Sequence, residues 1–292
     1  MRKMTSYRIL SMGVRLGLIF AMFISAAKAQ RAPNRLSDVE LYCSGLVTDQ
    51  AVPHDAYIVS GEDSSYKLTF QPGNYVYINR GADQGIKAGD QFDVIRPEVD
   101  PNKGKWFKYQ SQLYRAMGTM YADIGRLRVL SVQPKTATAE IGLSCDLLQR
   151  GDLIRPFQPR PTPPLHDLKF DPLVPPSGKK TAMVVSAKSF GTLAGVGSIV
   201  YINLGSVQGV QAGNYFRVFR YQGTHIDTNY QVRDMAYKAF GFGSTPVAYH
   251  WDDLPRQVLG EGIVLRTGPN SSTVFLTTAR EDIYIGDYVE LE

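Results

Sequence analysis

Several short stretches of the chain alternate between two kinds of side chain. Residues 74–81 place tyrosines at every second position with apolar residues between them, and residues 90–97 show the same period of two. This period predicts β-strands, because successive side chains of a strand point to opposite faces. Residues 136–143 and 272–279 are runs that contain several β-branched side chains, which also favour strands. Short strands at this spacing predict a small barrel or sandwich.

The residues between the first two strands predict a tight turn. Gly81, Gly85 and Gly89 accept positive φ angles without steric cost, and Asp90 can hydrogen-bond to nearby backbone. We expect this loop to join two antiparallel strands.

The same stretch occurs twice. Residues 75–96 return as residues 199–220 with twelve of 22 positions identical and no gap. A second block follows in each half, because residues 125–154 correspond to residues 260–289, and both blocks end in Gly-Asp. The repeated turn residues predicted to be structural are Gly81, Gly85, Gly89, Asp90, Gly151, Asp152, Gly205, Gly209, Gly213, Gly286 and Asp287.

The polar residues of the two copies differ more than the glycines and apolar residues. Asp83 pairs with Val207, Lys87 with Gln211, Asp90 with Asn214 and Asp93 with Arg217. A duplicated catalytic site would keep its charged groups in at least one copy and show their types clearly. We therefore interpret the repeat as scaffold.

A proline-rich segment separates the two halves. Eight of the 17 prolines lie between Pro156 and Pro176, and proline fixes φ and lacks the donor that a strand needs. The expected organisation is all-β, with two tandem small β-barrel or sandwich repeats that carry short helical inserts. We expect a signal peptide at 1–29, a first β-repeat domain at 30–157, a proline-rich linker at 158–180 and a second β-repeat domain at 181–292.

The N-terminus has the three parts of an export signal. Five basic residues flank an apolar run at 16–27, and Ala27-Lys28-Ala29 is a small-x-small cleavage site. The run is too short to span a bilayer, and no later run predicts a transmembrane segment. We expect the mature protein in the periplasm or secreted; the alternative is an uncleaved anchor.

Cleavage would change the charge of the chain. The signal holds five basic residues and no acid, so the mature chain keeps 27 basic residues (32 − 5) and 27 acidic ones. A formally neutral protein lacks the general basic field that releases counterions from phosphates, so we expect no nucleic-acid partner.

Two cysteines, Cys43 and Cys145, remain after the signal. In an oxidising compartment a pair of thiols favours a disulfide. The alternative is two buried thiols that do not meet.

Candidate chemistry is sparse. The four histidines form no H-E-x-x-H pattern, and His225 with Asp227 or His250 with the acids after it lacks further ligands nearby. Ser64 and Lys67 match S-x-x-K without its partner motifs. We expect no enzyme, no metal and no cofactor.

The inserts between the repeated blocks are rich in aromatic residues. Large aromatics in an excursion from a rigid barrel suit a binding surface, because they bury much area with few rotors. The alternative is that each insert covers an open barrel end with its aromatics in the core. The candidate binding residues are Trp106, Phe107, Tyr109, Tyr114, Tyr237, Phe240, Tyr249 and Trp251.

Residues 199–216, with "IYIGDYVEL" at 283–291, follow the outline G-x-x-x-G-(V/I)-x-x-G-D-x-F and I-x-x-G-D-x-V. In this they resemble the C-terminal β-domain of flagellar assembly protein T and related exported envelope proteins, some with LysM modules. "LYCSGLV" at 41–47 and "GDLIRPF" at 151–157 are similar to segments of uncharacterised exported proteins of environmental Gram-negative bacteria. The resemblance implies a β-rich envelope domain that acts by binding and has no catalytic residues. This sequence departs from the outline at Asn214, where Asp is expected, and has no LysM segment.

These observations lead to an expected function. The chain is expected to be a non-enzymatic scaffold that holds a protein partner in an envelope assembly. A peptidoglycan- or polysaccharide-binding module is the alternative, with a cell-wall glycan as partner. A hydrolase is the third hypothesis, and it predicts a deep pocket with convergent Ser, His and acid groups.

Overall fold

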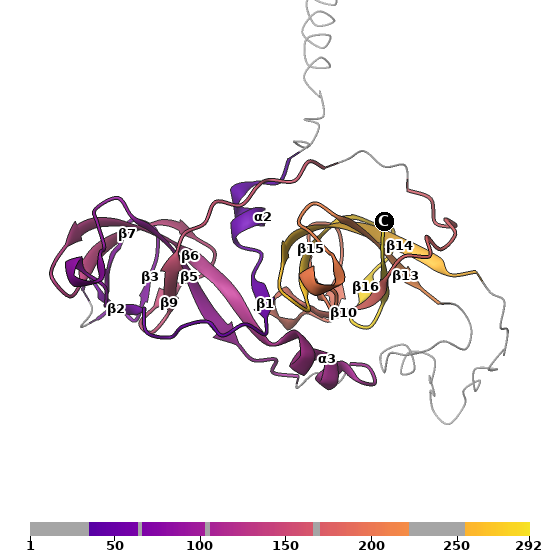
Figure 1. Ribbon diagram of the computed structural model, residues 1–292, viewed down its shortest axis with the longest axis horizontal. Helices are drawn as coiled ribbons and strands as arrows, with labels where there is room; N and C mark the ends of the chain where they lie inside the picture. The colour runs from indigo at the N-terminus through magenta and orange to yellow at the C-terminus, as the bar shows by residue number, and fades with distance from the viewer. Residues whose placement is uncertain (1–34, 64–65, 103–105, 166–169, 222–254) are drawn as a thin grey trace, which may run out of the picture. The chain divides into compact units, whose positions relative to one another are not determined.

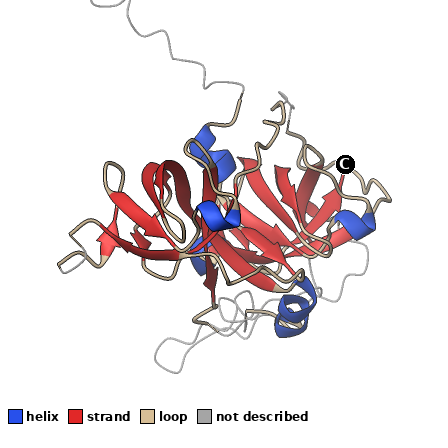
Figure 2. Cartoon of the chain, turned by 60° about the vertical axis from the view of Figure 1, so that its left-hand side comes forward, coloured by secondary structure: helices blue, strands red, loops and turns tan. Residues whose placement is uncertain are grey.

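The computed structural model describes residues 35–63, 66–102, 106–165, 170–221 and 255–292. Residues 35–292 form one compact unit. Strands make up most of the regular structure, and helices are few and short (Figure 2). The expected all-β class is therefore confirmed. The predicted signal peptide at 1–29 lies outside the described residues.

The first repeat is an antiparallel sheet that curls on itself. Its strands follow the order β2-β4-β7-β6-β5-β9, and β1 pairs with β6 beside this path. Figure 1 labels β2, β5, β6, β7 and β9 of this sheet. A bridge between Tyr57 and Leu153 joins the two ends of the path. The strands are β1 (Leu46–Thr48), β2 (Ile58–Gly61), β4 (Tyr75–Ile78), β5 (Gln91–Glu98), β6 (Thr119–Val132), β7 (Ala137–Ser144) and β9 (Leu153–Pro156), and β3 (Thr69–Phe70) pairs separately with β8 (Leu148–Gln149).

The second repeat is a closed barrel in the order β10-β12-β15-β14-β13-β17. Each strand takes the place of its counterpart in the first repeat, and the registers agree: Tyr77 lies opposite Thr138, and Tyr201 lies opposite Thr273. The duplicated sequence therefore encodes a duplicated fold. The strands are β10 (Thr181–Ala187), β12 (Ile199–Ile202), β13 (Tyr215–Arg220), β14 (Gln257–Thr267), β15 (Ser272–Ala279) and β17 (Tyr288–Leu291), with a separate pair β11 (Leu193–Ala194) and β16 (Ile283–Tyr284).

The strands on either side of the repeated loop are not neighbours, which corrects the expected strand pair. β4 pairs with β2 and β7, whereas β5 pairs with β6 and β9. The β6–β7 hairpin lies between them, and the loop is bonded to it: Ala82 N donates to Gln133 O at 2.9 Å and Gly89 N to Val129 O at 2.8 Å. The loop therefore crosses from one strand to another that is not adjacent to it.

The predicted alternation sets the core of the first barrel. Val76 and Ile78 are buried in it, while Tyr75 on the opposite face is 42% exposed. The equivalent face of the second barrel is covered. Tyr201 is only 2% exposed, because it packs in one cluster with Val47 and donates from its hydroxyl to Ser44 O at 3.1 Å.

Residues 44–49 connect the two barrels. Within this segment β1 pairs with β6, and Val47 O accepts from Ser271 Oγ at 2.6 Å. Gly45 O accepts from Thr273 Oγ1 at 3.3 Å.

Two α-helices are described. α2 (Asp38–Tyr42) begins with a capping box, in which Ser37 Oγ accepts from Glu40 N and Glu40 Oε2 accepts from Ser37 N. α3 (Gln110–Met117) lies in the first insert, where a helix was expected. Gln110 Nε2 donates to Val185 O at 2.8 Å, so α3 is fixed to β10.

The proline-rich linker lies between β9, which ends at Pro156, and β10, which begins at Thr181. Its described part is bonded to the second barrel. Pro172 O accepts from Val258 N at 3.2 Å, and Ser177 N donates to Glu290 at 2.8 Å.

Cys43 and Cys145 form a disulfide, as expected. Their Cα atoms are 5.4 Å apart, and the bond joins the end of α2 to the residue after β7. With 102 residues of separation, it closes a long loop.

Candidate functional site

The repeated glycines shape the same loop in both barrels. Gly85 and Gly209 have φ angles of 79° and 86° at equivalent turns. Gly81 has no room for a side chain, because a Cβ atom there would overlap the backbone of residues 133–136, and Gly205 meets residues 268–271 in the same way. The other predicted turn glycines, Gly89, Gly151, Gly213 and Gly286, also have positive φ angles.

The change from Asp90 to Asn214 preserves one hydrogen bond. Asp90 Oδ2 accepts from Lys87 N at 2.9 Å, and Asn214 Oδ1 accepts from Gln211 N at 2.8 Å. An amide oxygen accepts this bond as a carboxylate does. The turn is therefore preserved at Asn214, although the outline has Asp at this position.

Asp152 is a buried acceptor for an arginine. Asp152 Oδ1 and Oδ2 accept from Arg96 Nε and Nη2 at 2.7 and 2.9 Å, and Oδ2 also accepts from Gln149 N at 2.8 Å. Asp287 in the second barrel accepts the same two bonds from Arg220, at 2.8 and 2.6 Å. From the sequence these aspartates were predicted only as turn residues. Their arginine partners were not predicted, although both arginines end the repeated stretch.

A row of charged side chains crosses three strands of the first barrel. Asp93 on β5 lies opposite Arg126 on β6 and Arg155 on β9. Asp93 is buried although it points away from the barrel core, because the arginines and the segments around them cover it.

The equivalent row of the second barrel has every sign reversed. Arg217 on β13 lies opposite Glu261 on β14 and Glu290 on β17. The difference between Asp93 and Arg217 is therefore part of a coordinated exchange of three charges. All three exchanges can be read from the aligned repeats, but the sequence-based prediction compared only Asp93 with Arg217.

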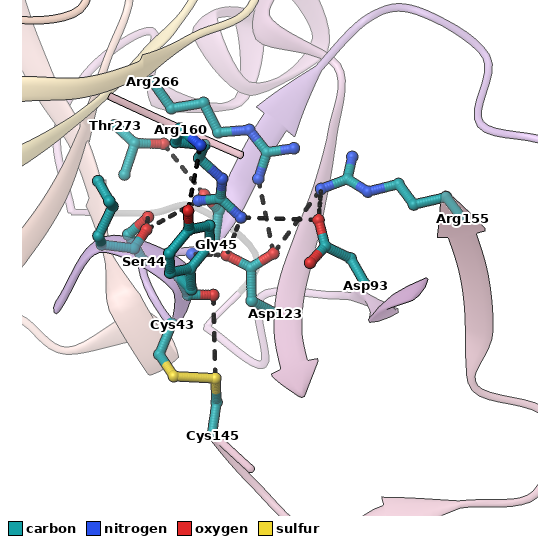
Figure 3. A network of polar contacts seen from close by, with 12 residues as sticks. Cys43, Ser44, Gly45, Asp93, Asp123, Cys145, Arg155, Arg160, Arg266 and Thr273 are labelled. Carbon is teal, nitrogen blue, oxygen red and sulfur yellow. Dashed lines mark hydrogen bonds and ion pairs between the residues drawn. A yellow bond between two sulfur atoms is a disulfide. The ribbon is translucent and has the colours of Figure 1, made fainter. Parts of the chain in front are cut away.

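The row in the first barrel belongs to a larger group of charges, which we call the arginine cluster. It consists of Asp93, Asp123, Arg126, Arg155, Arg160 and Arg266, and Figure 3 shows most of its members. Arg266 on β14 reaches Asp123 on β6, so the cluster includes side chains of both barrels. Asp123 Oδ2 also accepts from Gly45 N at 2.9 Å.

The ion pairs of the cluster are loose. Arg266 Nη1 lies 3.5 Å from Asp123 Oδ1, and Arg155 Nη2 lies 3.6 Å from Asp93 Oδ2. Arg160 Nη2 lies 3.6 Å from Asp123 Oδ2. These separations are longer than those of ordinary N–H···O hydrogen bonds, which reach about 3.2 Å. Arg160 Nη2 and Arg266 Nη1 are buried without a hydrogen-bond partner among the described residues.

Arg126 is held by aromatic rings. Its guanidinium carbon lies 4.1 Å from the ring centre of Tyr42 and 3.7 Å from that of Phe157. Cation–π contact satisfies the faces of the group but not its N–H donors. Arg126 Nε and Nη2 have no acceptor among the described residues.

Burial perturbs the titration of the cluster. It lowers the pKa of Arg266 to about 10, with Arg155 and Arg160 lowering it further and Asp123 opposing them. It raises the pKa of Asp93 against the attraction of the same two arginines. Burial thus disfavours the charged form of both groups.

Two cavities open beside the cluster, and together we call them the arginine cleft. One of about 720 Å³ is lined from the first barrel and from Ser206 and residues 266–269 of the second, and another of about 440 Å³ reaches Arg160. Both are lined by Arg155, Pro156, Gln158, Arg266 and Thr267.

The first aromatic insert lies against the second barrel. Phe107 is 4% exposed and packs within that barrel's core, with Trp106 partly buried against it. Tyr114 packs in a neighbouring cluster, whereas Tyr109 is 57% exposed. Of this set only Tyr109 is widely available to a partner. The second insert's candidates, Tyr237, Phe240, Tyr249 and Trp251, lie outside the described residues.

The histidines and Ser64, which were weaker candidates for chemistry, do not form a site among the described residues. His54 is exposed, and the other three histidines and Ser64 lie outside the described residues. Within the described ranges, no group of three His, Cys, Asp or Glu side chains is placed to hold a metal ion. None of the helices found there is both long and apolar enough to cross a bilayer.

Comparison with known proteins adds no relative. No protein-family model matches the chain, and no curated protein matches it. The resemblance to the β-domain of flagellar assembly protein T therefore stays a hypothesis.

Proposed function

We propose that the chain is an exported, non-enzymatic protein of the bacterial envelope that holds a partner protein in the arginine cleft. The observation that carries the proposal is the origin of the cleft. Its residues come from both barrels, and its arginines are not shared by the two repeats, whereas the shared residues fix turns and strands.

Export is supported by two features. The N-terminus has the sequence of a cleavable signal, and the disulfide between Cys43 and Cys145 suits an oxidising compartment such as the periplasm. A rigid holder is supported by the bonds that fix residues 44–49 and α3 to the second barrel. The proposal assigns no catalytic residue and no cofactor.

Site-specific photo-crosslinking tests the proposal. A photoreactive residue at Gln158, which lines both cavities, should give one discrete protein adduct in envelope fractions. The same residue at Lys135, which is exposed in a turn outside the cleft, should give none. The mass of the exported chain should correspond to cleavage after Ala29.

Three results would contradict the proposal. They are retention of the protein in the cytoplasm, equal adducts from Gln158 and Lys135, and no adduct from either position. Sedimentation of the parent protein with purified peptidoglycan, without a protein adduct, would favour the glycan-binding alternative.

A further inference from the structure

The arginine cluster holds more positive than negative charge. Four guanidinium groups face two carboxylates, so the described cluster has a formal charge of +2 (4 − 2). Burying charge is costly unless it is paired and hydrogen-bonded. Arg96 and Arg220 meet that condition, since their bonds to buried aspartates are 2.6 to 2.9 Å long. The ion pairs of the cluster, at 3.5 to 3.9 Å, do not meet it, although Arg160 Nη1 donates to Leu41 O at 2.8 Å.

Two arginines of the cluster line the cavities. Arg155 and Arg266 line both cavities, and Arg155 keeps about a quarter of its side chain exposed. Arg266 Nη1 is buried without an acceptor in the described part of the chain. Asp123 Oδ1 lies 3.5 Å from Arg266 Nη1 and 3.9 Å from Arg155 Nη2, yet the cluster keeps its excess of positive charge. An anion in the cleft beside these two guanidinium groups would offset that excess.

We infer that the arginine cleft binds an acidic peptide segment, with one of its carboxylates against Arg155 and Arg266. The inference rests on the proposed function and names the chemistry of the partner. A guanidinium group is a planar fork of donors that matches a carboxylate, and such charge-assisted bonds are the strong ones.

The lining of the larger cavity favours a peptide over a sugar chain. It includes aliphatic and proline side chains, among them Val52, Pro53 and Pro269, which suit the apolar parts of a peptide. Phe92 is the one aromatic among its described lining residues, and it is 6% exposed. It therefore offers little ring face on which a sugar could stack.

Calorimetric titration of the full chain tests the inference. The probes are a capped hexaglutamate peptide, a capped hexaglutamine peptide, inorganic phosphate and trigalacturonate. We expect hexaglutamate to bind more tightly than the other three and its affinity to fall as salt rises. Arg155→Gln should weaken hexaglutamate at least tenfold, which corresponds to about 1.4 kcal/mol. Arg128→Gln, an exposed arginine outside the cleft, should leave the affinity unchanged.

A stability measurement separates this role from a structural one. If the cluster only joins the barrels, Arg155→Gln lowers the melting temperature and the affinity together. If the cleft is built for an anion, Arg155→Gln relieves repulsion, so the melting temperature without peptide stays the same or rises. The rise in melting temperature that hexaglutamate causes in the parent should be lost.

Each other outcome overturns the inference. Tighter binding of trigalacturonate would assign the cleft to an acidic glycan, and equal binding of phosphate would assign it to a free oxyanion. No binding of any probe, or equal loss in Arg155→Gln and Arg128→Gln, would leave the cluster without this role. In those cases a protein adduct at Gln158 would still support the proposed function, with a partner of other chemistry.

Discussion

Arg96 and Asp152 are joined by two parallel hydrogen bonds across the first barrel, from β5 to the residue before β9. The second barrel repeats this pair as Arg220 and Asp287, and in both barrels the same arginine Nη2 also donates to a backbone oxygen, that of Leu147 or Asp282. The two copies thus keep charged residues where they fix the closure of a barrel. A polar pair that is repeated in both barrels therefore has a structural role, and we call each pair a staple because it closes its barrel.

Removal of one partner from this staple should be costly. Asp152 is 2% exposed, so Asp152→Asn leaves Arg96 without its counter-charge. We expect a loss of roughly 3 kcal/mol in the free energy of unfolding, the low end for a broken buried pair because Arg96 keeps some solvent contact. Urea unfolding measures it. Asp55→Asn breaks a more exposed pair with Arg80 and should cost less than about 1 kcal/mol, and equal losses would contradict the account.

Phe107 should matter for stability because it packs in the core of the second barrel. Phe107→Ala should lower the free energy of unfolding by about 3–5 kcal/mol. Tyr109→Ala, at the neighbouring exposed position, should lower it by less than about 1 kcal/mol. Chemical denaturation of both variants compares them. A stable Phe107→Ala variant would return this residue to the candidate binding surface.

A methyl group at Gly81 should disturb the loop by steric overlap and not by backbone strain, because the φ angle of Gly81 is an ordinary extended one. Gly81→Ala places a Cβ against the backbone of residues 133–136, and we expect a loss of about 1–3 kcal/mol or more from overpacking. Gly142→Ala on β7 has open space and should be nearly neutral. Thermal unfolding followed by circular dichroism checks the pair. Similar melting temperatures for the two variants would argue against the close approach.

The disulfide should stabilise the protein. It closes a loop across 102 residues of separation, so a Cys43→Ser, Cys145→Ser double variant should lose about 2–5 kcal/mol. Unfolding of the parent with and without reductant gives the same comparison without mutation. The double variant should be insensitive to reductant, and a parent that is also insensitive would contradict a stabilising bond.

Glu261 should make stability depend on pH. Burial raises its pKa from 4.5 to about 7, with Glu292 adding repulsion and Arg217 opposing both. Since the folded-state pKa lies above the unfolded one, this group's contribution is fully present below about pH 4.5 and is lost as the pH rises through about 7.

Denaturation series between about pH 5 and pH 8 measure the effect. The parent should lose more stability over this range than Glu261→Gln, which stays neutral throughout. Parallel curves for the two proteins would show that Glu261 does not titrate there.

Much of the fold could be predicted from local signals. The glycine spacing and strand alternation gave the repeated loop, the class and the two repeats, since these depend on residues close in sequence. The pairing of strands could not be predicted from local signals, because it depends on residues far apart in the sequence. Residues 75–78 and 91–98 look like partners across a short loop, and only the β6–β7 hairpin, supplied from later in the chain, separates them.

The candidate site was harder to predict because its members come from distant segments. Arg126, Arg155, Arg160 and Arg266 each look like an ordinary exposed arginine in the sequence, and the fold alone brings them together. The burial of Phe107 was hidden for the same reason, since a residue of the first repeat packs in the core of the second.

Hydrogen–deuterium exchange of the full chain, with and without saturating hexaglutamate, tests the central claim most directly. That claim is that the repeated residues build shape while the unrepeated arginines bind. We predict added protection in residues 153–160 and 264–269 and no change in the repeated Gly-Asp turns at 149–152 and 284–287, which do not line the cleft. Protection centred on those turns, or no protection anywhere, would contradict it.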